Sequence, residues 1–266
     1  MNLEGKVVIV TGSSRGIGKA IAIDCARKGA SVVIVARTET VGKLPGTILE
    51  TADEIRKLGG KALPMRCDVG SEEDVAAMVQ TVLAEFGRID ALINNAAVGL
   101  YVPFAEIQTK HWDLAFRVNV RGPFLCTKAV LPTMIAQQSG AMVNISSAAA
   151  QNVYSRVARA GGKRRTSGCA YGASKAALER LTLGLAEELK GHNIAANALK
   201  PSRSTYSEGM AFWNRDIDPS QFRSPYLYMS PAAVFLASQD ARGVTGGIFN
   251  DEELCKQYGL APISPI

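Results

Sequence analysis

The chain has 266 residues, of which 47% are hydrophobic and 20% are charged. This composition excludes a disordered or fibrous protein, and a chain of this length can bury enough apolar surface to fold without disulfides or a structural metal. The net charge of +6 is compatible with an anionic ligand but is too small to indicate a nucleic-acid-binding protein by itself.

Short apolar runs alternate with helical patterns along most of the chain. The expected strands are 6–10, 31–36, 61–66, 91–94, 141–145 and 194–199, and the expected helices are 16–28, 51–58, 71–86, 112–137 and 170–190. The strands are apolar at nearly every position, which is typical of strands covered on both faces. The alternation predicts one domain over residues 1–266, an α/β fold with a doubly wound, parallel Rossmann-type sheet in a three-layer α/β/α arrangement.

Three segments depart from this alternation. Residues 38–47 form a turn-rich extension after the second expected strand. Residues 151–168 form a basic, glycine-containing insertion, whose cations are Arg156, Arg159, Lys163, Arg164 and Arg165. Residues 201–228 begin with a polar, irregular stretch, and we interpret this segment as a flap over a substrate.

Cysteine and histidine are too few and too scattered to predict a metal site. The five cysteines form no CxxC pair, and only His111 and His192 accompany them. We therefore expect no metal and interpret the cysteines as buried, reduced thiols. No apolar run is long enough to span a membrane and the amino terminus lacks a signal-peptide pattern, so a cytoplasmic protein without a membrane span is expected.

A glycine-rich turn follows the first expected strand and opens the first expected helix. Its sequence, TGSSRGIG, runs from Thr11 to Gly18. Gly12 permits a tight turn, Gly16 lets the backbone approach a pyrophosphate, and Gly18 lets the helix pack closely on the strand. Free N–H groups at the helix N-terminus favour an anion there. Glycine triplets also occur in plain turns, but this strand–turn–helix position predicts a dinucleotide-binding site.

The residue at the end of the second expected strand indicates which dinucleotide binds. Folds that bind NAD usually place an acidic residue there, which holds the ribose 2′-hydroxyl. Here the residue is Arg37, and Arg15 lies within the glycine turn. Two guanidinium groups would pair with a 2′-phosphate, so NADP (NADPH) is the expected cofactor. Glu39 keeps NAD open as an alternative, and both arginines could instead be solvated surface residues.

Tyr171 and Lys175 are four positions apart at the start of an expected helix, so they share one face. An ammonium about 4 Å from a phenol is worth roughly 4 kcal/mol at an effective dielectric constant near 20. This interaction favours the ionised phenol and lets it exchange protons near neutral pH. The YxxxK pattern by itself also arises by chance, so its meaning depends on the residues around it.

The other motifs supply that context. They are TGSSRGIG, CDV at 67–69, NNA at 94–96, NVRG from Asn119, NISS at 144–147, YGASK at 171–175 and NALKP at 197–201. In this order they resemble the short-chain dehydrogenase/reductase family over about residues 3–250. The strings GTILETADEIRKLGGKALP and VTGGIFNDEEL are similar to the hydroxysteroid dehydrogenase-like branch of that family.

The resemblance implies a catalytic set of Asn119, Ser147, Tyr171 and Lys175. Tyr171 would be the general acid in carbonyl reduction and the general base in alcohol oxidation. Lys175 would lower the pKa of that phenol and hold the nicotinamide ribose, while Ser147 would hydrogen-bond the substrate oxygen. Asn119 would support a water chain to Lys175.

The resemblance also implies where the cofactor lies. Asp68 and Val69 would meet the adenine, Asn95 and Ala96 would line the ribose channel, and Pro201 would face the nicotinamide. The implied cofactor-binding positions are Gly12, Ser14, Arg15, Gly16, Ile17, Gly18, Arg37, Asp68, Val69, Asn95, Ala96, Ala97, Tyr171, Lys175 and Pro201.

Several positions depart from the family pattern. Ala97 and Ser202 stand where the family usually has glycine, and a side chain there could crowd the cofactor. The stretch between Ser147 and Tyr171 is longer than usual because it contains the insertion 151–168. The cations of that insertion suggest an anionic substrate, although a solvated loop without a ligand would have the same composition.

These observations predict an NADP-dependent oxidoreductase that interconverts a ketone or aldehyde and an alcohol. Its substrate would be a small, lipid-like or anionic molecule, and the resemblance implies a homo-oligomer, a dimer or a tetramer. A non-catalytic NADP-binding sensor or scaffold is the alternative, favoured by Ala97, Ser202 and the insertion. Nucleic-acid binding through the basic insertion is not expected, because its cations are not interleaved with aromatic residues that could stack on bases.

Overall fold

A parallel sheet forms the centre of the computed structural model, which describes residues 1–152, 156–157, 165–166, 168–209, 218, 220 and 222–263. Within these residues the sheet has seven strands in the order β3-β2-β1-β4-β5-β8-β9. The strands are β1 (Val7–Thr11), β2 (Ser31–Ala36), β3 (Lys61–Arg66), β4 (Ala91–Asn94), β5 (Gly140–Ile145), β8 (Ile194–Lys200) and β9 (Ile248–Asn250). The expected Rossmann-type α/β fold is therefore confirmed.

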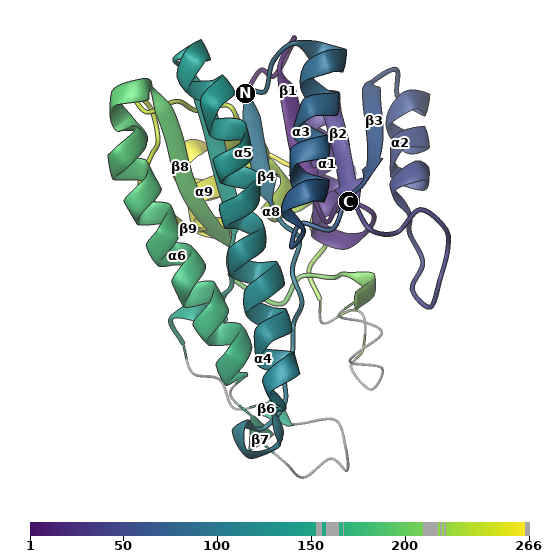
Figure 1. Ribbon diagram of the computed structural model, residues 1–266, viewed down its shortest axis with the longest axis vertical. Helices are drawn as coiled ribbons and strands as arrows, with labels where there is room; N and C mark the ends of the chain where they lie inside the picture. Colours follow the sequence, from purple (N-terminus) through teal and green to yellow (C-terminus); the bar gives the residue numbers. More distant parts are fainter. Residues whose placement is uncertain are drawn as a thin grey trace.

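Helices connect successive strands and cover both faces of the sheet. They are α1 (Gly16–Arg27), α2 (Ile48–Lys57), α3 (Glu72–Phe86), α4 (Thr109–Phe116), α5 (Gly122–Gln137), α6 (Cys169–Leu189), α8 (Met229–Ala237) and α9 (Asp251–Tyr258). Short helical segments are η1 (Phe104–Glu106), η2 (Arg117–Arg121), η3 (Ala148–Ala150) and η4 (Lys190–His192). Figure 1 shows α3, α5 and α6 in front of the sheet, with α1 and α8 behind it.

The alternation of side chains within each strand produces two cores. In β1, Val8 and Val10 pack with α1 and α8, whereas Val7 and Ile9 pack with α3 and α5 on the opposite face. Burial on both faces explains why the central strands are apolar at successive positions. The edge strand β3 is only partly buried and contains Pro64, which is tolerated at the edge of a sheet.

Capping residues account for several helix ends. Ser71 accepts a hydrogen bond from the Asp74 N–H at the start of α3, and Gly87 ends that helix with a φ of 69°. Thr47 and Glu50 form a capping box at the start of α2. The expected start of this second helix, at residue 51, was therefore wrong by three residues, because the extension 38–47 ends in a cap.

The expected helix 112–137 is three segments in the structure. A π-helix, η2, lies between α4 and α5 and carries Asn119 on an irregular turn. Such π-bulges are frequent at functional sites. The elements α8, β9 and α9 were not predicted from the sequence. No helix within the described residues is long and apolar enough to cross a membrane.

None of the five cysteines, all of which the structure describes, forms a disulfide: Cys25, Cys67, Cys126 and Cys255 are buried, and Cys169 is exposed. Burial raises the pKa of the Cys67 thiol to about 12, which makes it inert. The expectation of buried thiols was wrong for Cys169, because this residue lies in the first turn of α6 at the end of the sheet where the strands terminate.

Candidate active site

The three glycine positions of the turn leave no space for a side chain. A Cβ on Gly12 would lie 2.7 Å from the Cα of Ala96, and one on Gly18 would lie 2.4 Å from the carbonyl oxygen of Gly12. Gly12 and Gly16 also have φ values of 67° and 56°, which favour glycine. The turn therefore lies directly against the loop that follows β4, and the N-terminus of α1 begins within it.

Asn95 holds the two halves of this cradle together. Its Nδ2 donates to the carbonyl oxygens of Thr11 and Gly12 at 2.9 and 3.1 Å. The Thr11 hydroxyl accepts hydrogen bonds from the N–H groups of Asn95 and Ala96. Asn95 thus contacts the turn through its side chain and backbone, while Ala97, one residue further on, is exposed.

Arg15 extends from the glycine turn to the extension 38–47. Its Nη2 donates to the carbonyl oxygen of Gly46 at 2.8 Å, whereas its buried Nε has no hydrogen-bond partner among the described residues. Arg37 is exposed at the end of β2. Glu39 pairs with Arg66 at 3.7 Å. Arg15 therefore lies in the turn with a guanidinium donor that no described residue satisfies. Arg37 follows β2 with its side chain exposed.

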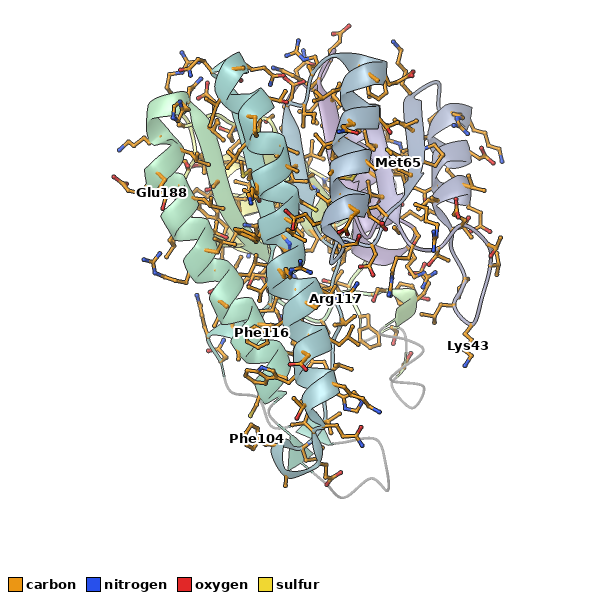
Figure 2. All side chains as sticks on the ribbon, in the orientation of Figure 1. Lys43, Met65, Phe104, Phe116, Arg117 and Glu188 are labelled. Atoms are coloured by element: carbon orange, nitrogen blue, oxygen red, sulfur yellow. The ribbon has the colours of Figure 1, made fainter. Side chains whose placement is uncertain are left out.

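Asp68 lies beyond the end of β3 and is already paired within the chain. Its carboxylate accepts from the Gly70 N–H at 2.9 Å and from Arg117 Nη2 at 2.6 Å. Burial tends to raise the pKa of Asp68, but the Gly70 N–H, Arg117 and the charge of Arg37 together hold it below its usual range. Val69, the next residue, is buried. Figure 2 shows Arg117 below the sheet, on the part of the molecule reached by α4.

Asn119 is fully buried in η2 and bonds to three groups. Its Oδ1 accepts from the Val98 N–H at 2.8 Å, and its Nδ2 donates to the Val98 carbonyl oxygen and to the Ser174 hydroxyl, each at 3.0 Å. Ser174 in turn donates to the carbonyl oxygen of Tyr171 at 2.7 Å. Asn119 thus connects the loop after β4 to the first turns of α6, the helix that carries Tyr171 and Lys175.

Lys175 is a buried cation one turn after Tyr171. It is 2% exposed, its Nζ donates to the Ile145 carbonyl oxygen at 2.6 Å, and it lies 5.9 Å from the centroid of the Tyr171 ring. Burial lowers the pKa of Lys175 to about 8, against the opposing effect of the Glu179 carboxylate. A lysine in this state changes its charge close to neutral pH, as proton-transfer sites require.

Ser147 lies at the end of β5 and caps η3, where its hydroxyl accepts from the Ala149 N–H at 3.2 Å. The first turn of α6 packs against this segment, because a Cβ on Gly172 would lie 2.7 Å from the Ala149 carbonyl oxygen. The close packing brings the segment of Ser147 beside the segment of Tyr171. The four expected catalytic residues therefore lie in η2, in α6 and at the start of η3, just after β5, at one end of the sheet.

The segment after β8 covers the glycine turn. Pro201 follows β8, and the Ser202 N–H donates to Asp251 Oδ1 at 2.7 Å, which anchors the segment to α9. A Cβ on Gly16 would lie 2.7 Å from the Cβ of Ser207. The described part of the expected flap therefore contacts the cradle directly.

Sequence reasoning missed several residues near Tyr171. The ring of Tyr101 lies 5.4 Å from that of Tyr171 at an interplanar angle of 52°. Gln151, Glu179 and Lys200 form a polar cluster behind Ser147. A lysine directly before Pro201, at the end of an apolar strand, was a detectable signal for that cluster, whereas nothing in the sequence places Tyr101.

The basic insertion falls largely outside the described residues. Only the backbone of Arg156–Val157 and Arg165–Thr166 is described within its cationic part, where these residues pair as the antiparallel strands β6 and β7. The expected role of its cations in binding an anionic substrate therefore concerns side chains outside the described residues.

A nicotinamide dinucleotide fits the residues present. The cradle made by Gly12, Gly16 and Gly18 has the close backbone approach that a pyrophosphate needs, and it lies at the N-terminus of α1. The cradle also lies after β1, next to the loop that follows β4, and the strand order reverses between these two strands, which is the usual binding position in such sheets. The unsatisfied Nε of Arg15 supplies a buried donor beside it.

Comparison with known proteins agrees with this geometry. Residues 6–215 match the model of the short chain dehydrogenase family. The chain belongs to this family. It is 37% identical over 259 residues to hydroxysteroid dehydrogenase-like protein 2 of Bos taurus, with 97% of this chain and 59% of that protein covered. The chain thus spans about 59% of the length of this relative and is a member of the hydroxysteroid dehydrogenase-like branch.

Two solved structures show the family likeness in three dimensions. A metagenomic short-chain oxidoreductase in complex with NADP is 31% identical with a TM-score of 0.74, covering 93% of this chain and 97% of that one. A 7α-hydroxysteroid dehydrogenase complexed with NADH and 7-oxo glycochenodeoxycholic acid is 29% identical with a TM-score of 0.79, covering 94% and 93%. Similar proteins of this family thus bind either nicotinamide cofactor.

Proposed function

We propose that the protein is an NADP(H)-dependent oxidoreductase that interconverts a carbonyl group and an alcohol, with Tyr171 as the general acid and base. Membership of the short chain dehydrogenase family supports the reaction class. The observation that carries the proposal is the buried Lys175, one turn from Tyr171, whose pKa burial lowers to about 8. A buried cation is costly to keep, so its position beside a phenol points to proton transfer.

In this mechanism Tyr171 gives its hydroxyl proton to the carbonyl oxygen of the substrate during reduction. Protonated Lys175 stabilises the phenolate that remains, and the charge attraction between them lowers the barrier to proton release. Ser147 donates a hydrogen bond to the same substrate oxygen, and Asn119 holds the first turns of α6 in place through Ser174. When bound, the nicotinamide supplies the hydride that the carbonyl carbon accepts.

The cofactor preference rests on Arg15 and Arg37. Gly12, Ser14, Gly16, Ile17 and Gly18 would surround the pyrophosphate, while Asn95, Ala96, Ala97 and Pro201 would line the nicotinamide side and Asp68 and Val69 the adenine side. Arg37 is exposed and Arg15 has an unsatisfied Nε, so both could pair with a 2′-phosphate. Glu39 is engaged by Arg66, which weakens the alternative that it binds a ribose 2′-hydroxyl.

The domain organisation, the substrate class and the oligomeric state belong to the same proposal. We propose that residues 1–266 form one domain, that 201–228 act as the substrate flap, and that the substrate is a small or lipid-like carbonyl compound. Members of this family commonly form dimers or tetramers, and a homo-oligomer is proposed here. The exposed side chains of Phe124 on α5 and Leu183 on α6 support this, since large apolar groups on neighbouring helices favour a protein contact.

The first experiment measures thermal unfolding with NADPH and NADH titrated separately. A ligand at about 100 times its dissociation constant adds roughly 2.7 kcal/mol of stability, so the tighter cofactor raises the midpoint at lower concentration. We expect NADPH to act at the lower concentration. Equal responses would contradict the NADP preference, and no response to either would contradict the proposed function.

The second experiment replaces Tyr171 by Phe. We expect carbonyl reduction, followed by the loss of NADPH absorbance with a panel of cyclic ketones and aliphatic aldehydes, to fall about 10³-fold. NADPH binding should stay close to that of the wild type, because the phenol oxygen belongs to the substrate step. Tyr258→Phe, on α9, is the matched control and should keep full turnover. Turnover retained in Tyr171→Phe would contradict the role of the phenol.

A further inference from the structure

A buried cation lies directly before Pro201, and the reaction as derived above does not use it. Lys200 ends β8, its side chain is 7% exposed, and its Nζ lies 4.0 Å from Oε1 of Glu179, which is equally buried. Burying a lysine and a glutamate is expensive unless each has partners. The surroundings of this pair therefore indicate what it does.

Two neutral side chains complete the cluster. Gln151 accepts from Lys200 Nζ at 2.5 Å and donates through Nε2 to Glu179 Oε2 at 3.0 Å. The Ser146 hydroxyl donates to Glu179 Oε1 at 2.7 Å. The cluster therefore connects four segments of the chain. Its members are Ser146, which precedes Ser147, Gln151, which begins the insertion, Lys200 at the end of β8 and Glu179 in α6. Each of these segments adjoins a proposed catalytic or cofactor-binding residue.

Glu179 also acts on Lys175, because the two residues lie one turn apart in α6. Its negative charge opposes the effect of burial and raises the pKa of Lys175. Lys200 counteracts that charge, since a cation at 4.0 Å neutralises part of the carboxylate field. The charge that Lys175 faces therefore depends on both members of the pair.

Charged groups lie on α6 and on the elements packed against it. Around Lys175, α6 itself contributes Tyr171 and Glu179, and β5 contributes the carbonyl oxygen of Ile145, while Lys200 of β8 lies beside Glu179. The cations of η2 are engaged on the adenine side, where Arg117 bonds Asp68 and Arg121 bonds the Gly70 carbonyl oxygen. The remaining titratable residues on elements packed against α6 are Lys110, His111 and Asp113 of α4, and Lys190 and His192 of η4.

We propose that Lys200 and Glu179 are positioning residues of the proposed reaction. They form a buried ion pair that holds the serine segment against β8 and sets the electrostatic field at Lys175. This inference rests on the proposed function, because Lys175 matters to catalysis only through Tyr171. The pair itself touches neither the substrate nor the cofactor in this scheme.

The test measures the titration of Lys175 directly, in the full chain labelled with ¹³Cε-lysine, by NMR. The resonance of Lys175 is identified by its absence in Lys175→Met. Lys200→Gln removes a like charge and should raise the pKa of Lys175, whereas Glu179→Gln removes the counter-charge and should lower it, each by about half a pH unit or more. Lys200→Arg keeps the charge and should leave the titration unchanged. Lys190→Gln, an exposed charge at the far end of α6, is the control and should have no effect.

The same variants give a second measurement in turnover. The alkaline limb of the pH profile of carbonyl reduction should move up in Lys200→Gln and down in Glu179→Gln. If the proposed function is wrong, no variant turns over, yet the NMR titrations still shift in opposite directions. If Lys175 titrates alike in wild type and Glu179→Gln, the inference is overturned even if the enzyme is active. Should Lys200→Gln not fold, the near-isosteric Glu179→Gln still decides the outcome.

Discussion

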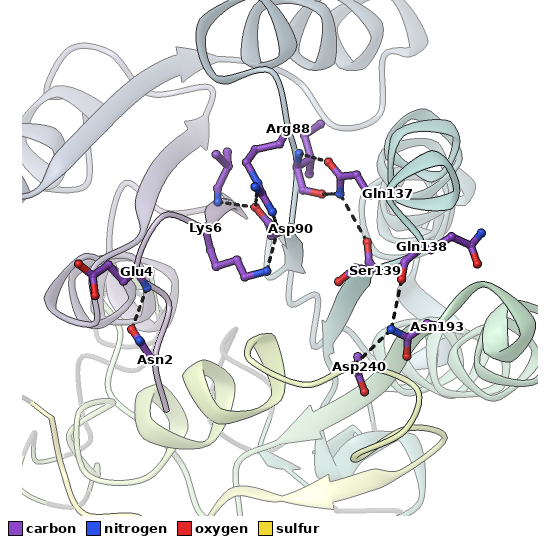
Figure 3. Close-up of polar contacts among 12 residues, drawn as sticks. Asn2, Glu4, Lys6, Arg88, Asp90, Gln137, Gln138, Ser139, Asn193 and Asp240 are labelled. Carbon is purple, nitrogen blue, oxygen red and sulfur yellow. Dashed lines mark hydrogen bonds and ion pairs between the residues drawn. The ribbon is translucent and has the colours of Figure 1, made fainter.

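The two ends of the sheet are built differently. At the amino end, Asp90 accepts from the Val7 N–H, from Lys6 and from two nitrogens of Arg88, and Gln137 bonds both backbone groups of Ile89, as Figure 3 shows. At the carboxyl end lie the buried Lys175, the unsatisfied Arg15 Nε and the unsatisfied carboxylate oxygen Oε2 of Glu208. Among the described residues, the orphaned atom near the amino end is a neutral one, Oδ1 of Asn193.

This difference separates stability from function within one sheet. The paired charges at the amino end favour the folded state, because the partners of Asp90 outweigh its loss of water and hold its pKa below the usual range. The carboxyl end keeps charged groups that the chain itself does not satisfy, which costs stability and leaves them available for a ligand. Changes at the two ends should therefore have opposite signatures.

The largest effect is expected at Lys175. Lys175→Met should reduce carbonyl reduction at least about 100-fold, because the phenol loses its cation. Its free energy of unfolding at pH 7 should rise by about 1–2 kcal/mol, since a buried charge is removed. Burial lowers the pKa of Lys175 to about 8, below that of the unfolded chain, so the wild type regains this stability as the pH rises above 8.

Urea unfolding at pH 7 and at pH 9.5, with exposed Lys190→Met as the control, measures the effect of Lys175→Met on stability. The free energy of unfolding of Lys175→Met should exceed that of the wild type by less at pH 9.5 than at pH 7. A variant that is inactive and also less stable at pH 7 would contradict the view that the carboxyl end is kept at a cost to stability.

The second-largest effect is expected on cofactor binding at the carboxyl end, where Arg37 lies. Arg37→Ala should weaken NADPH binding by about 10- to 100-fold and change NADH binding little, because only the former carries a 2′-phosphate. Fluorescence titration with each nucleotide measures this. Arg56→Ala, an exposed arginine on α2 that pairs with Asp53, is the matched control. Equal losses for both nucleotides would show that Arg37 does not read the phosphate.

At the amino end the signature should be reversed. Asp90→Asn should lower the free energy of unfolding at pH 7 by about 1–2 kcal/mol. The loss is modest because Lys6 and Arg88 are partly exposed, so solvent screens their charges. Turnover should stay unchanged, because Asp90 lies at the end of the sheet away from the proposed site. Although burial opposes it, the bonds from Arg88, Val7 and Lys6 hold the pKa of Asp90 below its usual range. That stability is present above the unfolded pKa, near 4, and is lost as the pH falls through the folded pKa.

Urea midpoints of Asp90→Asn and wild type should therefore converge below about pH 4. Loss of activity in folded Asp90→Asn would break the separation between the two ends.

The smallest effect is expected where the extension 38–47 meets the cradle. Thr47→Ala removes the capping box of α2 and should cost about 1 kcal/mol of unfolding free energy. Because Arg15 bonds the neighbouring Gly46, NADPH binding should weaken a few-fold as well. Thr81→Ala, an exposed threonine on α3, is the control in denaturation and binding experiments. Unchanged NADPH binding would show that the cap acts on stability alone.

Local patterns in the sequence were sufficient for most of the fold, whereas the roles of the site residues stay predictions. The apolar runs of β1, β2, β4, β5 and β8 predicted their own burial, because a strand covered on both faces needs apolar residues at successive positions. The glycines of the cradle were readable because a positive φ and a close backbone approach both exclude side chains. The π-turn at Asn119 was not readable, since it depends on hydrogen bonds to Val98 and Ser174 in other segments.

Tertiary structure alone decided how these residues act on one another. The sequence put Tyr171 and Lys175 on one helical face, but it could not show that Lys175 is 2% exposed, because that burial is created by the packing of α6 on β5 and β8. Likewise, Glu179 and Lys200 are 21 positions apart, and only the fold brings them to 4.0 Å. Residue identity is local, whereas desolvation and charge pairing depend on distances between segments far apart in the chain.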